Sequence, residues 1–331
     1  MRFQTNYIYA VLLATAIGVA GCASPRHDAT PAGVPYTGVP VSLHPAPGLR
    51  AVHASLDRSS LAYMNARRAE VGLPPISPDR DVAAAAAAHA SYLRLNSARG
   101  HDEMVGAQGF TGVDVTARVR VHTPTYGASE VQAVFGGVQQ PASAVAEIYA
   151  SPFHRGVVLF DWARAGEAVD GVNAGITVVD FADIAPVLTD AELIAYPYDG
   201  QADAPASWID EEQPDPMGAA SGYVGALVGY PITLSGSPNA HIDLKALELT
   251  DARGKRVACR IAPLSPADAG RNTAVCTPFV PLEAGALYAV HATGFLTRSA
   301  TAERAPFELR WHFATAPASD DAPRHNYLAA R

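Results

Sequence analysis

The chain has 331 residues, a formal net charge of −8 and 17% charged residues. This length allows two domains with separate hydrophobic cores. Lysine and arginine form no dense cluster, and the nearest approach to one, Arg67-Arg68, lies within a predicted helix. We therefore expect no nucleic-acid partner.

Residues 1–21 are predicted to be a lipoprotein signal peptide. Met1-Arg2 gives a positive start, and the apolar run from Tyr7 to Val19 is too short to span a membrane. The run ends in Val19-Ala20-Gly21-Cys22, which resembles the bacterial lipobox and implies that lipid is attached to Cys22 after cleavage. The alternative is an ordinary signal peptide with an incidental cysteine.

Lipid on Cys22 would anchor the protein to a membrane, because each buried methylene contributes roughly 0.8 kcal/mol. Residue 23 is alanine, so no aspartate at this position indicates retention in the inner membrane. The expected location is the cell envelope, on the outer membrane and facing the periplasm or the exterior. Residues 22–50 carry six prolines and are predicted to form an extended tether.

Residues 51–182 are predicted to form a first domain in which helices pack on a small sheet, an α/β layer arrangement. The elements expected in chain order are helices over 56–71, 77–96 and 114–121, a helix from Pro141, and strands over 156–160 and 173–181. Ser77 is the expected N-cap of the second helix, with Pro78 at its first position. The alanine tract Ala83–Ala88 of that helix indicates close packing against a neighbour. His89 on the same helix is either a buried, hydrogen-bonded group or part of a cleft.

Residues 183–318 are predicted to form a linker and an all-β second domain. Prolines and acids crowd 196–216, and the acids of Asp210–Asp215 are expected to form a solvated face. Further on, Phe307–Phe313 alternates strictly, with two phenylalanines, a leucine and a tryptophan on one face. Short strands separated by turns predict a sandwich of immunoglobulin-like type, followed by a flexible tail over 319–331.

Cys259 and Cys276 are the cysteines that remain once Cys22 is used for lipid. An exported chain lies in an oxidising compartment, so we expect a disulfide between them. Its loop length corresponds to about 3 kcal/mol of stabilisation in chain-entropy models. No histidine is near either cysteine in the sequence, so neither is a candidate catalytic thiol.

The polar candidates for chemistry in the first domain are His101, Glu103, Asp114, Glu130 and His154. Two histidines with carboxylates could hold zinc or another divalent cation, with water in the remaining positions. The same groups could act as acid and base on a bound water. Spacing alone does not distinguish these roles from those of hydrogen-bonded structural histidines, because no HExxH or paired CxxC motif is present.

Five motifs run through the first domain in order. They are Leu61…Asn65-Ala66-Arg67…Gly72-Leu73-Pro74-Pro75, the alanine-rich helix with His89, Gly100-His101, Ser129-Glu130-Val131 and Ser151-Pro152-Phe153-His154-Arg155. Over roughly residues 55–182 they resemble the CAP domain, also called the SCP or cysteine-rich secretory family. The resemblance implies an α-β-α sandwich whose central cleft carries two histidines and two acids, with zinc or another divalent ion bound in several members.

His101, Glu130 and His154 match the family's cleft residues. The usual Gly-Glu-Asn-Ile around one acid is Ala128-Ser129-Glu130-Val131 here, so the glutamate is retained while its neighbours differ. Asp114 is the expected other acid, and Glu103 is the alternative. Pro152 would then end a helix so that His154 faces the cleft. The second domain resembles the SbsA-type Ig-like domain of bacterial surface proteins at Tyr196-Pro197-Tyr198-Asp199-Gly200 and Trp311-His312-Phe313-Ala314-Thr315.

Three functions are compatible with these residues. The first is a binding module that captures a lipid, a sterol-like molecule or a glycan fragment, because the family contains lipid-binding members. The second is a metal-dependent hydrolase, peptidase-like, in which Glu130 activates a water held by His101 and His154; no GxSxG stretch or free thiol near a base supplies another nucleophile. The third is a non-catalytic adhesion or structural protein. We favour the first, since a fold resemblance does not license a reaction; the sequence indicates no particular protein partner.

Overall fold

The computed structural model describes residues 38–47, 59–134, 141–171, 175–218, 221–238, 240–263, 272–298 and 303–318. The predicted signal peptide, the lipidation site Cys22 and the predicted tail over 319–331 lie outside these residues. All the described residues belong to one compact unit. No helix among the described residues combines the length and apolar character that crossing a membrane requires.

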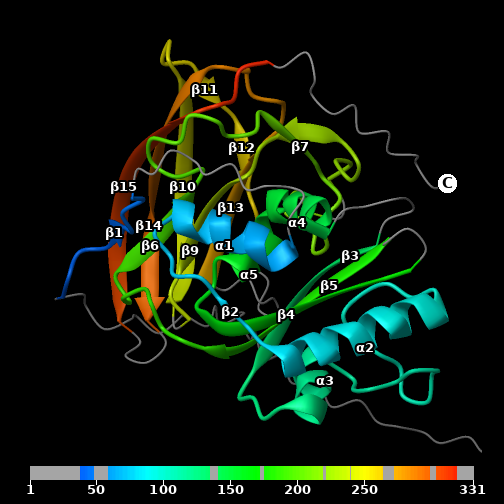
Figure 1. Cartoon of the computed structure of the whole chain (residues 1–331). Helices are drawn as coiled ribbons and strands as arrows, with labels where there is room; N and C mark the ends of the chain where they lie inside the picture. The colour runs from blue at the N-terminus through cyan, green and yellow to red at the C-terminus, as the bar shows by residue number, and fades with distance from the viewer. Residues whose placement is uncertain are drawn as a thin grey trace, which may run out of the picture. The chain divides into compact units, whose positions relative to one another are not determined.

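The first body is a four-stranded sheet with helices on both faces (Figure 1). In sheet order its strands are β2 (Ser77–Pro78), β4 (Trp162–Asp170), β5 (Ile176–Ile184) and β3 (Ala128–Val134). The helices are α1 (Ser60–Glu70), α2 (Arg80–Asn96), α3 (Val115–His122), α4 (Pro141–Ala150) and α5 (Pro152–Val158). Because α2 and α3 cover one face while α1, α4 and α5 cover the other, the predicted layering of helices on a sheet is observed.

Strand β5 is buried on both faces, and its alternation decides which side chains meet which helices. Phe181 packs with the α1 and α4 side, whereas Val178 and Ala182 pack with α2 and α3. Side chains in a strand alternate between faces, so Asp180 also points to the α2 side. Asp180 is paired in register with Glu130 of β3. Two carboxyl groups therefore lie side by side between the sheet and the α2 layer.

Helix α2 packs very closely on β4, as its alanine tract predicts. Ala85, Ala86 and Ala90 are fully buried. A Cβ atom added to Gly166 of β4 would clash with the backbone of Ala83, so only glycine fits at this crossing. The small residues of both elements allow the backbones to approach and bring His89 down towards the sheet.

The N-terminus of α2 differs from the prediction. Asp79, not Ser77, is the N-cap, and its carboxylate accepts hydrogen bonds from the backbone N–H groups of Asp81 and Val82. Ser77 and Pro78 instead form β2, which pairs with β4. Pairing with the sheet holds these two residues extended, so the helix begins only after them. The third predicted helix, 114–121, is α3 with Asp114 as its N-cap.

The predicted strand over 156–160 is wrong, because most of this segment is helix α5. Its two adjacent valines favour a strand by local propensity, but tertiary contacts decide otherwise. Arg68 donates hydrogen bonds to the carbonyl groups of Val158 and Phe160 at 2.9 and 2.6 Å, which satisfies the C-terminal end of the helix. Gly156 gives α5 close contact with Thr273 of the second body.

The second body contains two sheets that share one core. The first has the order β1-β6-β9-β13-β12 and the second the order β11-β10-β14-β15, beside a two-stranded ribbon β7-β8. Their bounds are β1 (Ser42–Leu43), β6 (Glu192–Tyr196), β7 (Ser207–Ile209), β8 (Leu227–Gly229), β9 (Ile232–Gly236), β10 (Ala240–Asp251), β11 (Arg256–Val257), β12 (Cys259–Ile261), β13 (Thr273–Pro278), β14 (Leu287–Arg298) and β15 (Arg304–Ala314). Inward side chains of both sheets form a single cluster, and β15 alternates as predicted with Trp311 buried. The immunoglobulin-like type stays a prediction.

Part of the predicted tether is held against the second body. Ser42–Leu43 form β1, which runs parallel to β6. The backbone N–H groups of Ser42 and His44 donate hydrogen bonds to the carbonyl oxygens of Ala191 and Leu193. An extended segment offers free N–H and C=O groups to the edge of a sheet, which explains why this portion is ordered.

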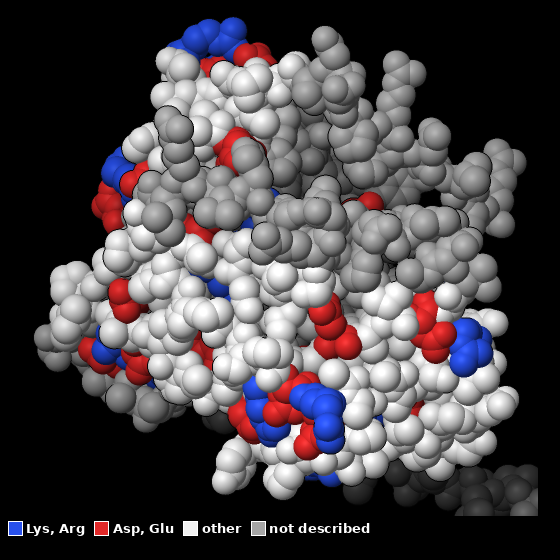
Figure 2. Space-filling view, viewed as in Figure 1, with Lys and Arg blue, Asp and Glu red and all other residues white. Residues whose placement is uncertain are grey.

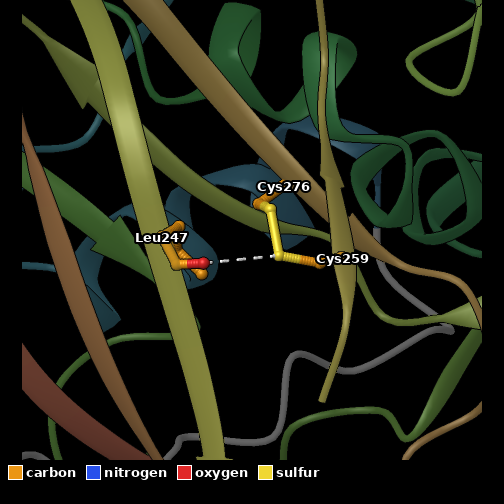
Figure 3. Close-up of a disulfide and its surroundings, with 3 residues drawn as sticks. All are labelled: Leu247, Cys259 and Cys276. Carbon is orange, nitrogen blue, oxygen red and sulfur yellow. Dashed lines mark hydrogen bonds between the residues drawn. A yellow bond between two sulfur atoms is a disulfide. The ribbon is translucent and has the colours of Figure 1, made fainter. Parts of the chain in front are cut away.

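The predicted disulfide between Cys259 and Cys276 is present, with the two Cα atoms 5.6 Å apart (Figure 3). It joins β12 to β13 within one sheet, so it fastens an edge strand to its neighbour. The sulfur of Cys259 also lies 4.0 Å from the carbonyl oxygen of Leu247 in β10 of the other sheet. A disulfide sulfur carries no hydrogen, so this approach is a van der Waals contact.

The charged side chains are well mixed on the face shown in Figure 2. Lysine and arginine occur there in small groups next to aspartate and glutamate, and they form no continuous basic surface. Ion pairs of opposite charge also occur among the described residues: Arg164 pairs with both Asp79 and Asp183 at 2.8 Å. The expectation that nucleic acid does not bind stays a prediction.

Candidate functional site

Three of the residues selected from the sequence converge beside β3, the edge strand of the first sheet. The Nδ1 atom of His101 lies 2.8 Å from Oε1 of Glu130. The ring centroids of His101 and His154 are 6.4 Å apart. The side chains of His101 and His154 are 45% and 18% exposed, while that of Glu130 is buried. Solvent therefore reaches both imidazoles, and the buried glutamate lies against His101.

Three different elements position these groups. His101 is in the loop after α2, Glu130 is on β3, and His154 is in the first turn of α5. As expected, a helix ends in front of Pro152, because the residue before a proline is held extended, as Ser151 is. Helix α4 already ends at Ala150, and Pro152 occupies the start of α5, where its missing N–H is not needed. His154 is thus fixed by a helix instead of following one.

Glu212, from the second body, completes the support of His154. Its Oε1 accepts hydrogen bonds from Nδ1 of His154 at 2.6 Å and from the backbone N–H of His154 at 2.7 Å. Its Oε2 accepts from the backbone N–H of Phe153 at 3.1 Å. The one carboxylate therefore has two roles: it neutralises the positive end of α5, and it orients the imidazole of His154. The predicted solvated face over 210–215 is wrong here, because Asp210 and Glu212 are both buried.

The two exposed histidines are held in the same way. Each places Nδ1 against a buried carboxylate, so Nδ1 carries the proton and donates it. No hydrogen bond within the described part of the chain uses Nε2 of His101 or of His154. Both Nε2 lone pairs are therefore available to a ligand, which is the arrangement by which proteins orient metal-binding histidines.

Beneath His101, Glu130 is enclosed by positive and hydrogen-bonding groups. Its Oε2 accepts a hydrogen bond from Arg118 at 2.7 Å, and His89 approaches its Oε1 at 3.5 Å. Burial raises the pKa of Glu130, but the hydrogen bond from His101 and the charges of His89 and Arg118 outweigh it, so the pKa lies below its usual value. Glu130 is therefore ionised at neutral pH.

His89 proves to be a buried, fully bonded group. Its Nδ1 is 2.9 Å from Oε1 of Glu103, and its Nε2 is 3.3 Å from the carbonyl oxygen of Gly100. Glu103 also accepts the backbone N–H of Thr111 at 2.6 Å, which closes the loop after α2. With both ring nitrogens in use, His89 braces the site from below and has no nitrogen left for a ligand.

The two candidates for the second acid, Glu103 and Asp114, lie in different surroundings. Glu103 belongs to the buried network with His89 and lies 3.9 Å from Nε of Arg118. Asp114 is exposed and caps α3 by accepting the backbone N–H of Ala117 at 2.7 Å. The structure therefore brings Glu103, not Asp114, into the cluster.

Asp180 faces Glu130 and is fully buried, with no donor for either carboxyl oxygen. Burial, followed by the negative charge of Glu130, raises the pKa of Asp180 well above its usual value. A proton on Asp180 accounts for both observations, because its O–H can then donate to the ionised Glu130. The strand Ile176–Ile184 thus contributes one neutral acid to the floor of the site.

Sequence reasoning missed Arg118, Asp180 and Glu212. Asp180 had a detectable signal, since an acid at an inward position of an otherwise apolar strand must be paired or neutral. Arg118 is one of several arginines and carried no signal of its own. Glu212 lies far along the chain in an acidic run, and nothing local to it indicates contact with α5.

Comparison with the models of known protein families agrees with the motifs. Residues 61–160 match the sequence model of the CAP family, described as the cysteine-rich secretory protein family. One similar solved structure is an extracellular protein containing a SCP domain from Bacillus anthracis str. Ames, with 19% identity, a TM-score of 0.31 and coverage of 37% of this chain and 38% of that one. Another is an outer surface protein from Borrelia burgdorferi, with 17% identity, a TM-score of 0.32 and coverage of 38% of this chain and 90% of that one.

The chain spans less than half of the length of the Bacillus protein. No curated protein matched the chain. The match to the CAP family therefore covers residues 61–160, the segment in which the five motifs lie.

Proposed function

We propose that this chain is an envelope-anchored binding protein that captures a small or lipidic ligand at its exposed histidine pair, with a divalent cation held between His101 and His154. One observation carries the proposal: two solvent-reachable imidazoles from separate elements each have Nδ1 fixed by a buried carboxylate and Nε2 free. Lipid on Cys22, which the lipobox implies, would place this site at the membrane surface.

The histidine pair fits a cation. Rings that share one ion through Nε2 have centroids roughly 5–6 Å apart when metal–nitrogen distances are about 2.0–2.1 Å. The observed distance of 6.4 Å between the ring centroids is slightly longer than this range. No group of three or more His, Cys, Asp or Glu suited to a metal occurs within the described residues. A cation held by two imidazoles alone would keep open positions for water or for a donor atom of a ligand.

Binding is favoured over hydrolysis by the state of the carboxylates. A general base must reach the water whose proton it takes. Both oxygens of Glu130 are committed, to His101 and to Arg118, and its side chain is buried. Glu212 is equally committed to three donors of α5. Neither carboxylate is placed to activate a water beside the histidines.

Titration of the metal-free full-length chain with zinc tests the cation. We expect one ion per chain, with an affinity reduced at least tenfold in His101→Ala and in His154→Ala. His312→Ala is the matched control, since His312 is an exposed strand histidine 3.0 Å from Asp199. Equal zinc binding by all four proteins would refute the assignment of the cation to this pair.

Analysis of what the protein carries tests the ligand. Protein purified from the envelope should release a small or lipidic molecule on extraction, and the His101→Ala and His154→Ala variants should carry less of it. Equal amounts on the wild type and both variants would show that the molecule is held elsewhere. Preparations that are empty both with and without zinc would contradict the binding function.

A further inference from the structure

A short segment, residues 41–46, contacts both bodies, and we call it the clasp. On the second body its strand β1 extends a sheet, and the backbone N–H groups of Ser42 and His44 donate hydrogen bonds there at 2.9 and 2.8 Å. Val41 is buried in the core of that body. Nδ1 of His44 also lies 3.1 Å from Oε1 of Glu192 in β6. The clasp therefore docks through backbone, apolar and polar contacts together.

The other end of the clasp lies against the first body, at the turn that follows α1. Gly72 in this turn has a φ angle of +80°, which glycine adopts readily. A Cβ atom on Gly72 would lie 2.9 Å from the carbonyl oxygen of Pro45 and 3.1 Å from Nε2 of His44, so a larger residue does not fit. Ala46 packs against the hydrophobic cluster that contains the buried residues of α1 and α4. The clasp thus spans the junction of the two bodies.

The contact with the first body leads to α5, the helix that carries His154. The turn at Gly72 is closed by a backbone hydrogen bond of 2.9 Å from Leu73 to the carbonyl oxygen of Arg68. The guanidinium of Arg68 in turn donates to the carbonyl groups at the C-terminal end of α5. The position of this turn therefore bears on the C-terminal end of α5.

The contact with the second body leads to the same helix. Strand β6, on which β1 docks, ends at Tyr196. The guanidinium of Arg155 in α5 lies 4.8 Å from the centroid of the Tyr196 ring, a cation–π contact. Arg155 is fully buried and directly follows His154. Both sides of the clasp are therefore connected through packed side chains to the helix that presents one histidine of the site.

The clasp is also an element that can open by itself. Strand β1 is two residues long and lies at the edge of its sheet. Short edge elements open at a lower free energy than the core of a protein. A docked clasp and a released one are two discrete arrangements, as coupling between distant positions requires.

We propose that the clasp is a conformational switch for the histidine site. When docked, it holds α5 so that His154 stays on the carboxylate of Glu212; when released, it lowers the affinity of the site for its cation. This regulation rests on the proposed function, because it acts on the same histidine pair. The clasp lies within the predicted tether, so a pull on the tether acts on it directly.

Hydrogen exchange of the full-length chain tests the release. In Val41→Asp the amide of His44 should lose protection by about tenfold or more, because a charge replaces a buried apolar side chain. Val39→Asp is the matched control, since Val39 lies just outside the clasp and is 66% exposed. Ser42→Pro is a second, uncharged variant that removes the hydrogen bond to Ala191, and it decides the question if Val41→Asp does not fold.

Two measurements read the coupling to the site. In ¹⁵N NMR of the imidazoles, Val41→Asp and Ser42→Pro should move the proton of His154 from Nδ1 to Nε2 in part of the molecules, whereas Val39→Asp should not. Zinc affinity of the metal-free chain should fall about fivefold in the same two variants. Because coupling is reciprocal, saturating zinc should raise the protection of the His44 amide in the wild type by the same factor.

Two results would overturn the proposal. One is a released clasp with a His154 spectrum identical to that of the wild type, whatever the zinc affinity. The other is unchanged protection of the His44 amide in Val41→Asp and Ser42→Pro, since β1 would then not open by itself. A wild-type chain that binds no zinc would contradict the proposed cation, and the spectrum of His154 would then decide the coupling alone.

Discussion

A buried carboxylate holds each of the two exposed histidines, but the two carboxylates come from different parts of the chain. His101 is held by Glu130, and both belong to the segment that matches the CAP family. His154 also belongs to that segment, but its carboxylate, Glu212, comes from beyond it. The Glu130 carboxylate neutralises buried cationic groups, whereas Glu212 neutralises the end of a helix. The family motif thus places the imidazoles, and the second body determines how one of them is oriented.

The largest effect on the free energy of unfolding is expected from replacing Glu130, the carboxylate that holds His101. Glu130→Gln leaves the buried guanidinium of Arg118 without its anion, and breaking a buried pair from one side typically costs about 3–5 kcal/mol. Urea denaturation should show this loss in the free energy of unfolding. A loss below about 1 kcal/mol would mean that Arg118 is neutralised by Glu103 alone.

The contact between the two bodies gives the next largest effect. A Cβ atom at Gly156 would overlap the side chain of Thr273, so Gly156→Ala should cost about 2 kcal/mol by overpacking. Shortening the partner in Gly156→Ala/Thr273→Ala should recover about half of this loss. If the double variant is no more stable than expected from the sum of the two single variants, then α5 does not pack on β13 as described.

Glu212→Gln tests how the second body holds His154. The expected loss in the free energy of unfolding is smaller, about 1–2 kcal/mol, because hydrogen bonds to a neutral amide replace charge-assisted ones. The more specific readout is ¹⁵N NMR of the imidazoles. The proton of His154 should leave Nδ1 for Nε2 in part of the molecules, while His101 keeps its proton on Nδ1. A spectrum of His154 identical to the wild type would show that Glu212 does not orient it.

The smallest effect concerns Asp180 and depends on pH. Its pKa is raised in the folded state, so its contribution to stability is present below the unfolded value near pH 4 and is lost as pH rises towards the folded value. Asp180→Asn removes this loss and keeps a donor for Glu130. The variant should therefore gain stability over the wild type at pH 8 but not at pH 4. The same difference at both pH values would contradict a proton on Asp180.

Several features follow from local pattern and were predicted from the sequence. The alternation of Phe307–Phe313 predicts a strand because burial on one face imposes a period of two residues. The alanines of α2 predict its close approach to the sheet, which Gly166 completes. The strand predicted over 156–160 failed because two valines favour extended structure locally, while the carbonyl groups of Val158 and Phe160 found a buried arginine.

The sequence by itself determined the CAP motifs, the histidines and glutamate of the site, and the disulfide, because each rests on residue identity and nearby spacing. Only the tertiary structure decided that Glu103 and not Asp114 joins the cluster, that Asp180 lies against Glu130, and that Glu212 reaches α5. These three depend on which strands pair and which surfaces meet. Such pairings join residues from separate elements, so the partner that each side chain meets depends on the whole fold, even where a local signal, as at Asp180, indicates that a partner is needed.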